Sequence, residues 1–426
     1  MFTVFLLIFL VMLLLGAPIY LSMLTSGIAY CWLNGGIDSL MIIQKMFNSL
    51  DNFVLLAIPM FMLAGILMNT GGITDRIFYF CKALVGHHKG GLAYVNVLAS
   101  FIFSGMSGSA LADVGGLGQV EMKAMADEGY DDHVTLGVTA ASATMGPIVP
   151  PSIPMVLYGS AASVSVGALF SAGILPGVLV GLVLCVIISF VAKRNHYPVH
   201  ERASLKEIFR RFVKSFWALL MPVVIMGGIW CGYFTPTEAA CVGITYVLVV
   251  QIFIYKDLKV KQIPKAVSDA VTGIVPALAI VSAIALFGWV MQFEHLGTTI
   301  LNAVLAISTN KYVVLLLLNI VLLIMGSFVG SVPIILMFIP MFLPLTQAVG
   351  INPVHLGVVV VLNLMIGLMT PPVGQSLFMI ASVTKKDFGY VVSYTWRWLI
   401  PLFIALLIVT YWEGLVLWIP RILGLA

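Results

Sequence analysis

Two kinds of helix-breaking segment interrupt the uncharged stretches of this sequence, and each kind occurs twice. Gly and Ser dominate residues 104–109 and recur in 326–331, whereas residues 146–154 and 367–375 contain adjacent prolines. Proline removes a backbone donor and disfavours helix at the preceding residue, so carbonyl and amide groups are freed. Free carbonyls with nearby hydroxyls suit Na⁺, and the amides at helix N-termini suit a carboxylate. The chemistry expected here is binding of a cation and an organic anion.

These breaks predict two sodium sites with a substrate site between them. One Na⁺ is expected between residues 104–109 and 146–151, and a second between residues 326–331 and 367–372. The candidate ligands of the first site are Ser104, Ser107, Gly108, Gly146, Val149 and Pro151, and those of the second are Gly326, Gly330, Gly367, Thr370 and Pro372. The candidate substrate-binding residues are Ser109, Pro150, Ser152, Ser331, Thr370 and Gln375.

Each motif taken alone also has a purely structural explanation. Gly and Ser let membrane helices pack closely, and a single proline usually only kinks a helix. Repetition of both kinds of break at matched positions favours binding over packing, because hydrocarbon cannot satisfy freed backbone groups. Such backbone is tolerated where it lines a cavity or holds a ligand.

The surroundings of the breaks are those of a membrane protein. Hydrophobic residues make up 61% of the chain and charged residues 9%, whereas soluble domains have roughly 25% charged residues. We therefore expect an all-α polytopic membrane protein in contact with the lipid bilayer. The net charge of +4 sits in short loops, where basic residues report topology, so no nucleic-acid partner is expected. Uncharged runs long enough to cross the hydrocarbon core cover residues 1–37, 52–74, 90–112, 134–192, 215–237, 239–255, 270–293 and 312–384, with a last one around 398–412.

Basic residues orient these spans. The segment from Lys193 to Lys214 is the strongest basic loop and is placed in the cytoplasm. Two spans later the basic segment 256–265 must lie on the same side, and one further span puts 294–311 outside. The remaining basic clusters also fall inside, provided that residues 90–129 and 312–350 are hairpins that return to their own side. Within the cytoplasmic loop, Ser204 and Glu207 have the spacing of a capping box and should begin an amphipathic helix in the membrane interface.

The two halves of the chain repeat each other with opposite orientation. Gly108-Ser109 matches Gly330-Ser331 at an offset of 222, and residues 146–151 match 367–372 at an offset of 221. The first half reaches its Gly-Ser hairpin from the cytoplasm and the second half from outside. Inverted repeats are typical of secondary transporters, because they allow two conformations that are near mirror images.

Charge placement favours Na⁺ over H⁺ as the coupling ion. Residues 134–192 and 312–384 contain no Asp, Glu, Lys or Arg, whereas a proton-coupled carrier usually needs an ionisable relay. Asp113 is the one acid near a break, and it either lines the site or caps a helix end at the interface. The alternatives are a proton-coupled anion carrier acting alone and a channel. An intramembrane enzyme would need paired acids or a metal cluster at membrane depth. The sequence indicates neither of these, so we expect neither enzymatic activity nor an organic cofactor.

The motifs together resemble those of a known family. The core Ser-Gly-x-Ser-Gly-Ser-Ala-x-Ala-Asp of residues 104–113, the segment 146–154 and the segment 367–374 resemble the large membrane subunit of tripartite ATP-independent periplasmic (TRAP) transporters. The resemblance implies a Na⁺-driven importer of small carboxylates, such as sialic acids or C4-dicarboxylates, with the sialic-acid members looking most similar. It also implies a small membrane subunit, a periplasmic substrate-binding protein and a place in the bacterial inner membrane.

The fold that this resemblance implies is an elevator-type transporter with two re-entrant helical hairpins and two broken helices. Both hairpins would move with the transport domain against a fixed scaffold. The expected divisions are N-terminal scaffold spans in residues 1–51, a first inverted repeat in 52–165, scaffold spans with the amphipathic helix in 166–269, a second inverted repeat in 270–383, and a C-terminal span in 384–426.

Overall fold

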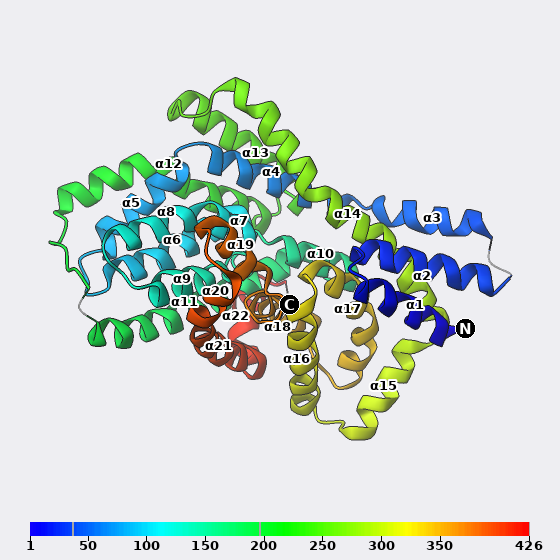
Figure 1. The fold of residues 1–426 in the computed structure, drawn as a ribbon. Coiled ribbons are helices and arrows are strands. Elements are labelled where there is room, and N and C mark those ends of the chain that lie inside the picture. Colours follow the sequence, from blue (N-terminus) through cyan, green and yellow to red (C-terminus); the bar gives the residue numbers. More distant parts are fainter. Residues whose placement is uncertain (36–37, 196, 426) are drawn as a thin grey trace.

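The chain folds into helices, and the part that the structure describes contains no strand (Figure 1). The computed structural model describes residues 1–35, 38–195 and 197–425. Eight helices within these ranges are long and apolar enough to cross a membrane, as the composition predicts for a polytopic protein. They cover Phe53–Thr70, Val166–Arg194, Leu205–Trp230, Pro236–Ile254, Val260–Phe293, Lys311–Phe328, Ser331–Ala348 and Phe388–Tyr411.

The first uncharged run holds two helices, which explains why it is too long for one crossing. Helix α1 (Phe2–Leu14) packs against α2 (Ile19–Leu33), and the chain reverses between them at Gly16, whose φ is +80°. Glycine adopts this left-handed backbone conformation without steric cost. Helix α3 (Ser39–Leu50) follows, while the end of the run at Ile37 lies outside the described residues.

The helices of the first half end at the breaks that the sequence contains. A short 3₁₀ turn, Phe53–Leu56, leads into α4. The Gly-Ser break separates α6 from α7, and the proline break separates α9 from α10. The elements of this half are α4 (Ala57–Thr70), α5 (Ile73–Val85), α6 (Gly91–Ser107), α7 (Ala110–Gly115), α8 (Leu117–Asp127), α9 (Asp132–Ala143) and α10 (Ile153–Ala162).

The second half repeats this order of helices at a nearly constant offset. The first residues of α7 and α17 stand at an offset of 221, and those of α9 and α18 stand at the same offset. The single helix α17 takes the place of the pair α7 and α8. The elements of this half are α14 (Ile263–Phe293), α15 (Leu296–Ile307), α16 (Lys311–Phe328), α17 (Ser331–Ala348), α18 (Pro353–Gly367) and α19 (Gln375–Thr384).

The two halves also pack against each other as related copies. Helix α7, which follows the first Gly-Ser break, contacts α19, which follows the second proline break. The equivalent contact with the halves exchanged joins α17 to α10, and it is also present. Exchanging the halves therefore reproduces the contact pattern, which is the expected result for internal repeats related by a pseudo-twofold axis.

Further helices connect and flank the repeats. They are α11 (Val166–Arg194), α12 (Leu205–Trp230), α13 (Pro236–Val249) with the π-helical turn Val250–Ile254, the 3₁₀ turn Val260–Gln262, α20 (Phe388–Thr395) with the 3₁₀ turn Trp396–Trp398, α21 (Leu399–Tyr411) and α22 (Glu413–Ile422). The predicted amphipathic helix is not a separate element, because it forms the first turns of the continuous α12. The Ser204 hydroxyl accepts a hydrogen bond from Glu207 N at 3.2 Å, but the Glu207 carboxylate pairs with Arg211 at 2.7 Å and with Arg210 rather than closing the capping box.

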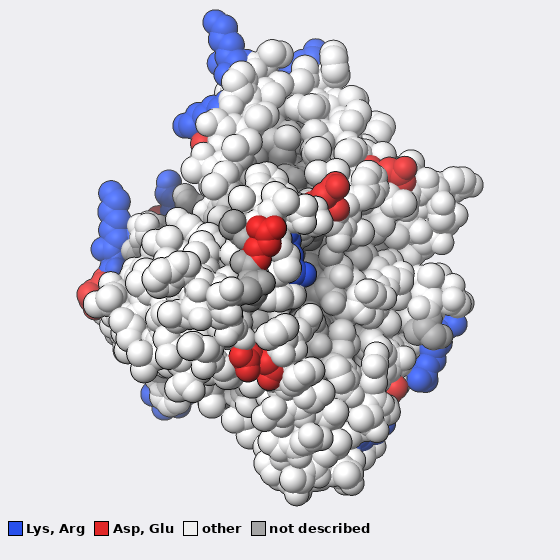
Figure 2. All heavy atoms as spheres, turned by 90° about the vertical axis from the view of Figure 1, so that its right-hand side faces the viewer, with Lys and Arg blue, Asp and Glu red and all other residues white. Residues whose placement is uncertain are grey.

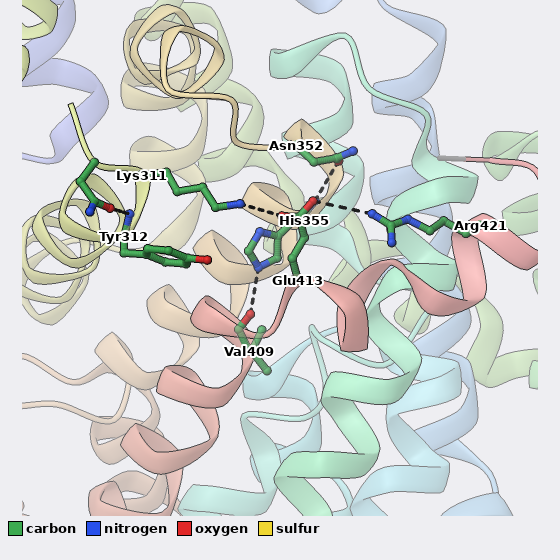
Figure 3. Close-up of polar contacts among 8 residues, drawn as sticks. Lys311, Tyr312, Asn352, His355, Val409, Glu413 and Arg421 are labelled. Carbon is green, nitrogen blue, oxygen red and sulfur yellow. Dashed lines mark hydrogen bonds and ion pairs between the residues drawn. The ribbon is translucent and has the colours of Figure 1, made fainter.

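The ion pairs of the described residues form two separate sets. Figure 2, which looks onto the side bearing α1, α2 and α3, shows mainly uncharged atoms, with a few acidic side chains within the face and most basic side chains toward its margins. One set of ion pairs joins residues assigned above to the cytoplasmic side, including Lys82–Glu128 at 2.7 Å and Arg76–Asp257 at 2.5 Å. At the opposite side, Lys311 and Arg421 approach Glu413 at 3.3 and 3.9 Å (Figure 3). In every ion pair of the described chain, both partners belong to the same set.

The pair Asp132–Lys386, on the side assigned above to the cytoplasm, makes stability depend on pH. Burial raises the pKa of Asp132, but hydrogen bonds from Lys386 and Tyr390 outweigh it and hold this pKa below its usual value. A lowered folded-state pKa stabilises the fold above the unfolded value of about 3.9, and this contribution is lost as the pH falls through the folded value. We expect Asp132→Asn to cost ~1 kcal/mol at pH 7 and progressively less below pH ~4.

Thermal unfolding of the purified chain across pH measures this difference. Asp127→Asn is the matched control, because Asp127 is exposed and forms no ion pair within the described residues. A constant gap between wild type and Asp132→Asn from neutral to acid pH would contradict the assignment.

Candidate functional site

The first pair of breaks meets through close backbone contacts. Gly108 ends α6 with a φ of +61°, and its carbonyl accepts a hydrogen bond from Ile153 N at 3.4 Å. A Cβ added at Gly108 would lie 2.6 Å from Pro151 O, and one added at Gly146 would lie 3.1 Å from the Ser109 carbonyl carbon. Glycine is therefore required where the Gly-Ser loop touches the proline loop. The structure brings together Gly108, Gly146 and Pro151, three of the candidate sodium ligands.

The other first-site candidates differ in what their groups can offer. The Ser107 hydroxyl is buried and has no hydrogen-bond partner in the described chain, so it is available to a ligand. The Ser104 hydroxyl instead donates to Ser100 O at 2.6 Å within its own helix. Val149 turns its side chain toward Gly177 of α11. Only backbone groups of Val149 can therefore face the loops.

The second pair of breaks repeats this arrangement. A Cβ added at Gly367 would lie 2.7 Å from the Gly326 carbonyl carbon, and Val373 N donates to Ser327 O at 3.2 Å. Gly330 lies against the Gln375 amide, which would be 3.1 Å from an added Cβ. The Thr370 hydroxyl donates to Ile366 O at 2.8 Å, and Pro372 is exposed. The Pro150–Pro151 and Pro371–Pro372 peptide bonds are both cis.

A cavity of about 310 Å³ lies where the two pairs of breaks face each other. Ser109, Ser331 and Gln375 line it, so three of the predicted substrate-binding residues share one space. The rest of its wall comes chiefly from apolar residues of α14, with others from α4, α7, α10 and α17, and none of the described residues on it is charged. Weak polarity with a few hydroxyl and amide groups is typical of a small-molecule site.

Three predicted substrate-binding residues do not reach this cavity. Pro150 and Thr370 are absent from its wall, and Ser152 is fully buried. The Ser152 hydroxyl donates to Pro147 O and accepts from Met155 N at 3.2 Å, so it holds the proline loop and caps α10. Sequence reasoning missed Gly273 and Pro276 of α14, which line the cavity. The only sequence signal for these two residues was the presence of a Gly and a Pro inside an apolar span.

A buried polar pair joins the helix before each Gly-Ser break to the helix before the proline break of the same half. In the first half the Ser142 hydroxyl lies 2.6 Å from Asn96 Oδ1, and in the second half Asn363 Nδ2 donates to Asn319 Oδ1 at 2.7 Å. Ser142 and Asn363 stand at an offset of 221, and Asn96 and Asn319 at an offset of 223, so the pairs are equivalents in the repeat. All four side chains are at most 5% exposed, and hydrogen bonding between them fixes how α6 meets α9 and how α16 meets α18.

Asp113 does not cap a helix end at the interface, one of the two roles considered for it. It lies within α7 with 1% of its surface exposed, packed between helices. It is also absent from the wall of the central cavity.

Comparison with known proteins identifies the family. A model described as "Tripartite ATP-independent periplasmic transporter, DctM component" matches residues 6–415. The chain belongs to this family. It is 42% identical over 407 residues to the sialic acid TRAP transporter large permease protein SiaM of Vibrio cholerae, covering 96% of this chain and 95% of the relative. It is 40% identical to the sialic acid TRAP transporter permease protein SiaT of Haemophilus influenzae, covering 98% of this chain and 68% of the relative.

Other TRAP large permeases and two solved transporters are also similar. The C4-dicarboxylate TRAP transporter large permease protein DctM of Pseudomonas aeruginosa is 40% identical, covering 90% of each chain. The Alcanivorax borkumensis YdaH transporter matches with a TM-score of 0.60 at 14% identity, covering 88% of this chain and 87% of that one. Neisseria gonorrhoeae MtrF matches with a TM-score of 0.60 at 12% identity, covering 89% of this chain and 84% of that one. At this identity the two structures indicate a shared fold alone.

The Ser152 cap gives a prediction for this TRAP large subunit. Ser152→Ala leaves Pro147 O and Met155 N without their buried partner, so we expect a loss of about 2 kcal/mol in stability and roughly tenfold slower uptake. Ser165→Ala is the matched control, because Ser165 caps α11 at an exposed position outside the breaks. Thermal unfolding and substrate uptake measure both effects, and equal uptake by the two variants would contradict a role for Ser152 in the proline loop.

Proposed function

We propose that this TRAP large subunit couples the inward flow of Na⁺ to import of a small carboxylate, with sialic acid as the first candidate. The observation that carries the proposal is the central cavity, which both pairs of breaks approach and which Ser109, Ser331 and Gln375 line. Hydroxyl and amide donors bind a carboxylate, and the N-terminal ends of α7 and α17 begin beside the cavity.

The Na⁺ sites would lie at the two contacts between Gly-Ser loop and proline loop. There the required glycines bring backbone segments close together, and the Ser107 hydroxyl lacks a protein partner in the described chain. Carbonyl oxygens and hydroxyls at interrupted helices are the ligands that coupling cations use in secondary transporters. The carboxylate substrate would be bound between two cations, so its charge would be balanced without a basic side chain in the cavity wall.

Transport would proceed by an elevator movement. Helices α6 to α8 and α16 to α17 would be re-entrant hairpins that carry the cavity, with α9–α10 and α18–α19 as the broken helices. The contacts that exchange between the halves, α7 with α19 and α10 with α17, join the four breaks into one body. A small membrane subunit and a periplasmic binding protein would complete the transporter in a bacterial inner membrane.

The substrate assignment follows the relatives. SiaM and SiaT, at 42% and 40% identity, are named for sialic acid, whereas DctM, at 40%, is named for C4-dicarboxylates. Sialic acid is tested first because the two relatives named for it match 96% and 98% of this chain.

Uptake into proteoliposomes tests the function. The chain is reconstituted with its small subunit and binding protein, and labelled sialic acid is compared with labelled succinate under an inward Na⁺ gradient or a proton gradient. Uptake that requires both Na⁺ and the binding protein is the expected result. Uptake driven by protons without the binding protein would favour a proton-coupled carrier acting alone, and gradient-independent flux would favour a channel.

A further inference from the structure

Two acidic side chains are buried in the first hairpin without a cationic partner among the described residues. Asp113 of α7 and Glu121 of α8 are each 1% exposed. All four of their carboxylate oxygens lack a hydrogen-bond partner in the described chain, and neither acid takes part in an ion pair there. Burying even one unpaired carboxylate is very costly, so this arrangement needs a positive charge that the side chains do not supply.

A further unpartnered group faces the same space. Gly118 stands between the two acids in the sequence. A Cβ added at Gly118 would lie 3.0 Å from the methyl group of Thr139 in α9. Thr135 lies one turn away on the same face of α9, toward the end that packs beside Glu121, and its buried hydroxyl has no partner in the described chain. Ser100 of α6 approaches Asp113 but hydrogen-bonds to Ser142 Oγ at 3.2 Å.

Titratable groups on the neighbouring helices do not neutralise the acids. Cys81 of α5 faces Glu121, and Tyr94 of α6 faces α11 instead. At the cytoplasmic end of α9, Asp132 pairs with Lys386, and His133 Nδ1 lies 3.0 Å from Trp398 Nε1. Helix α19 contributes no titratable side chain, and Lys123 and Asp127 of α8 itself are exposed.

The second repeat shows that the fold itself does not require these acids. With the hairpins aligned on Gly108-Ser109 and Gly330-Ser331, at an offset of 222, Asp113 corresponds to Ile335 and Glu121 to Leu343. Both of these are apolar residues of α17, the first fully buried and the second partly buried. The same hairpin architecture is therefore built in the second half with hydrocarbon at both positions, and the acids of the first half need a reason other than packing.

We propose that Asp113 and Glu121 form a proton-binding pair in the first repeat. A proton neutralises a buried carboxylate without any further ligand, whereas a dehydrated alkali ion would need several more oxygens. Asp113 lies near the hairpin tip, and Glu121 lies seven residues, about 10 Å along a helix, before Glu128. Glu128 is at the cytoplasmic edge with Lys82 and His200, so the pair stands between that edge and the breaks.

Infrared spectroscopy of the purified full-length chain tests this site without any transport assay, so its outcome is separate from that of the proposed function. Wild type should have the carbonyl band of a protonated carboxyl at neutral pH. Asp113→Asn/Glu121→Gln should lose the band, and the exposed-acid control Asp75→Asn should keep it. A band missing from wild type, or unchanged in the double variant, would overturn the proposal.

Thermal unfolding supplies a second readout. A site that holds a proton only in the folded chain loses stability as pH rises, so the unfolding temperature of wild type should fall more steeply with pH than that of the double variant. Stabilisation by Na⁺ should persist in the variant, and its loss would assign the site to Na⁺ instead. If the double variant does not fold, the single substitutions are compared, and a band unchanged in both would overturn the pair.

Discussion

Replacing Gly367 by alanine is expected to abolish Na⁺-driven uptake. The added Cβ would lie 2.7, 2.8 and 3.0 Å from three backbone atoms of Gly326, and backbone cannot move aside as a flexible side chain can. Both glycines are candidate ligands of the second sodium site. Overpacking of this kind costs about 3 kcal/mol, and if that cost falls on the cation-bound state, affinity for Na⁺ falls about 100-fold.

A graded series of glycine substitutions makes this expectation specific. Gly288→Ala is the matched control, because nothing lies within 4 Å of a Cβ at that helical position. The uptake of Gly146→Ala should lie between those of Gly367→Ala and Gly288→Ala, since a Cβ at Gly146 would lie 3.1 to 3.2 Å from its nearest atoms. Uptake and the Na⁺-dependent shift in unfolding temperature are measured for all three. If Gly367→Ala had the uptake and the Na⁺-dependent shift of wild type, the close contact would not be required for cation binding.

The sequence was sufficient to predict the class and the internal repeat because both depend on local or periodic features. A 9% content of charged residues permits no soluble surface, and the uncharged runs give the spans. Gly108 and the paired prolines stop helices wherever they occur, so α6 and α9 end near the predicted breaks. Matched breaks at offsets of 221 and 222 then require matched helices, and α7 and α17 begin at an offset of 221.

Tertiary partners could not be predicted in the same way. Asn96 and Asn363 are single polar residues within helices, and only the packing of α6 on α9 and of α16 on α18 places each beside its partner. The wall that α14 contributes to the cavity is likewise a contact between segments far apart in the chain. Ser152 was expected to bind substrate, but its hydroxyl is held by the proline loop itself.

Position along a helix also left the environment of two features undetermined. Asp113 stands close to glycines, a pattern that fits an exposed helix end as well as a buried turn, and packing against α19 decides between them. The amphipathic segment after Ser204 has no breaker before the next span, since Pro222 lies well inside α12. Helix therefore continues from the interface into the membrane, and periodicity alone gave no boundary.

Removing the two equivalent serines of the cavity is expected to affect the substrate and spare the cation. Ser109 and Ser331 occupy matching positions in the two repeats and line the same cavity. A hydrogen bond to a charged group contributes about 1.5–3 kcal/mol, so each alanine should lower kcat/KM for the carboxylate at least about tenfold and the double variant about 100-fold. Neither serine is among the candidate sodium ligands, so the Na⁺-dependent shift in unfolding temperature should remain.

Concentration-dependent uptake, with unfolding measured in Na⁺ and in choline, separates the two effects. Ser382→Ala is the control, because Ser382 is exposed on α19 and absent from the cavity wall. Unchanged uptake by Ser109→Ala/Ser331→Ala would place the substrate outside this cavity. Loss of the Na⁺ response together with uptake would mean that the two serines support the cation sites, and that substrate recognition depends on Gln375 and the helix N-termini instead.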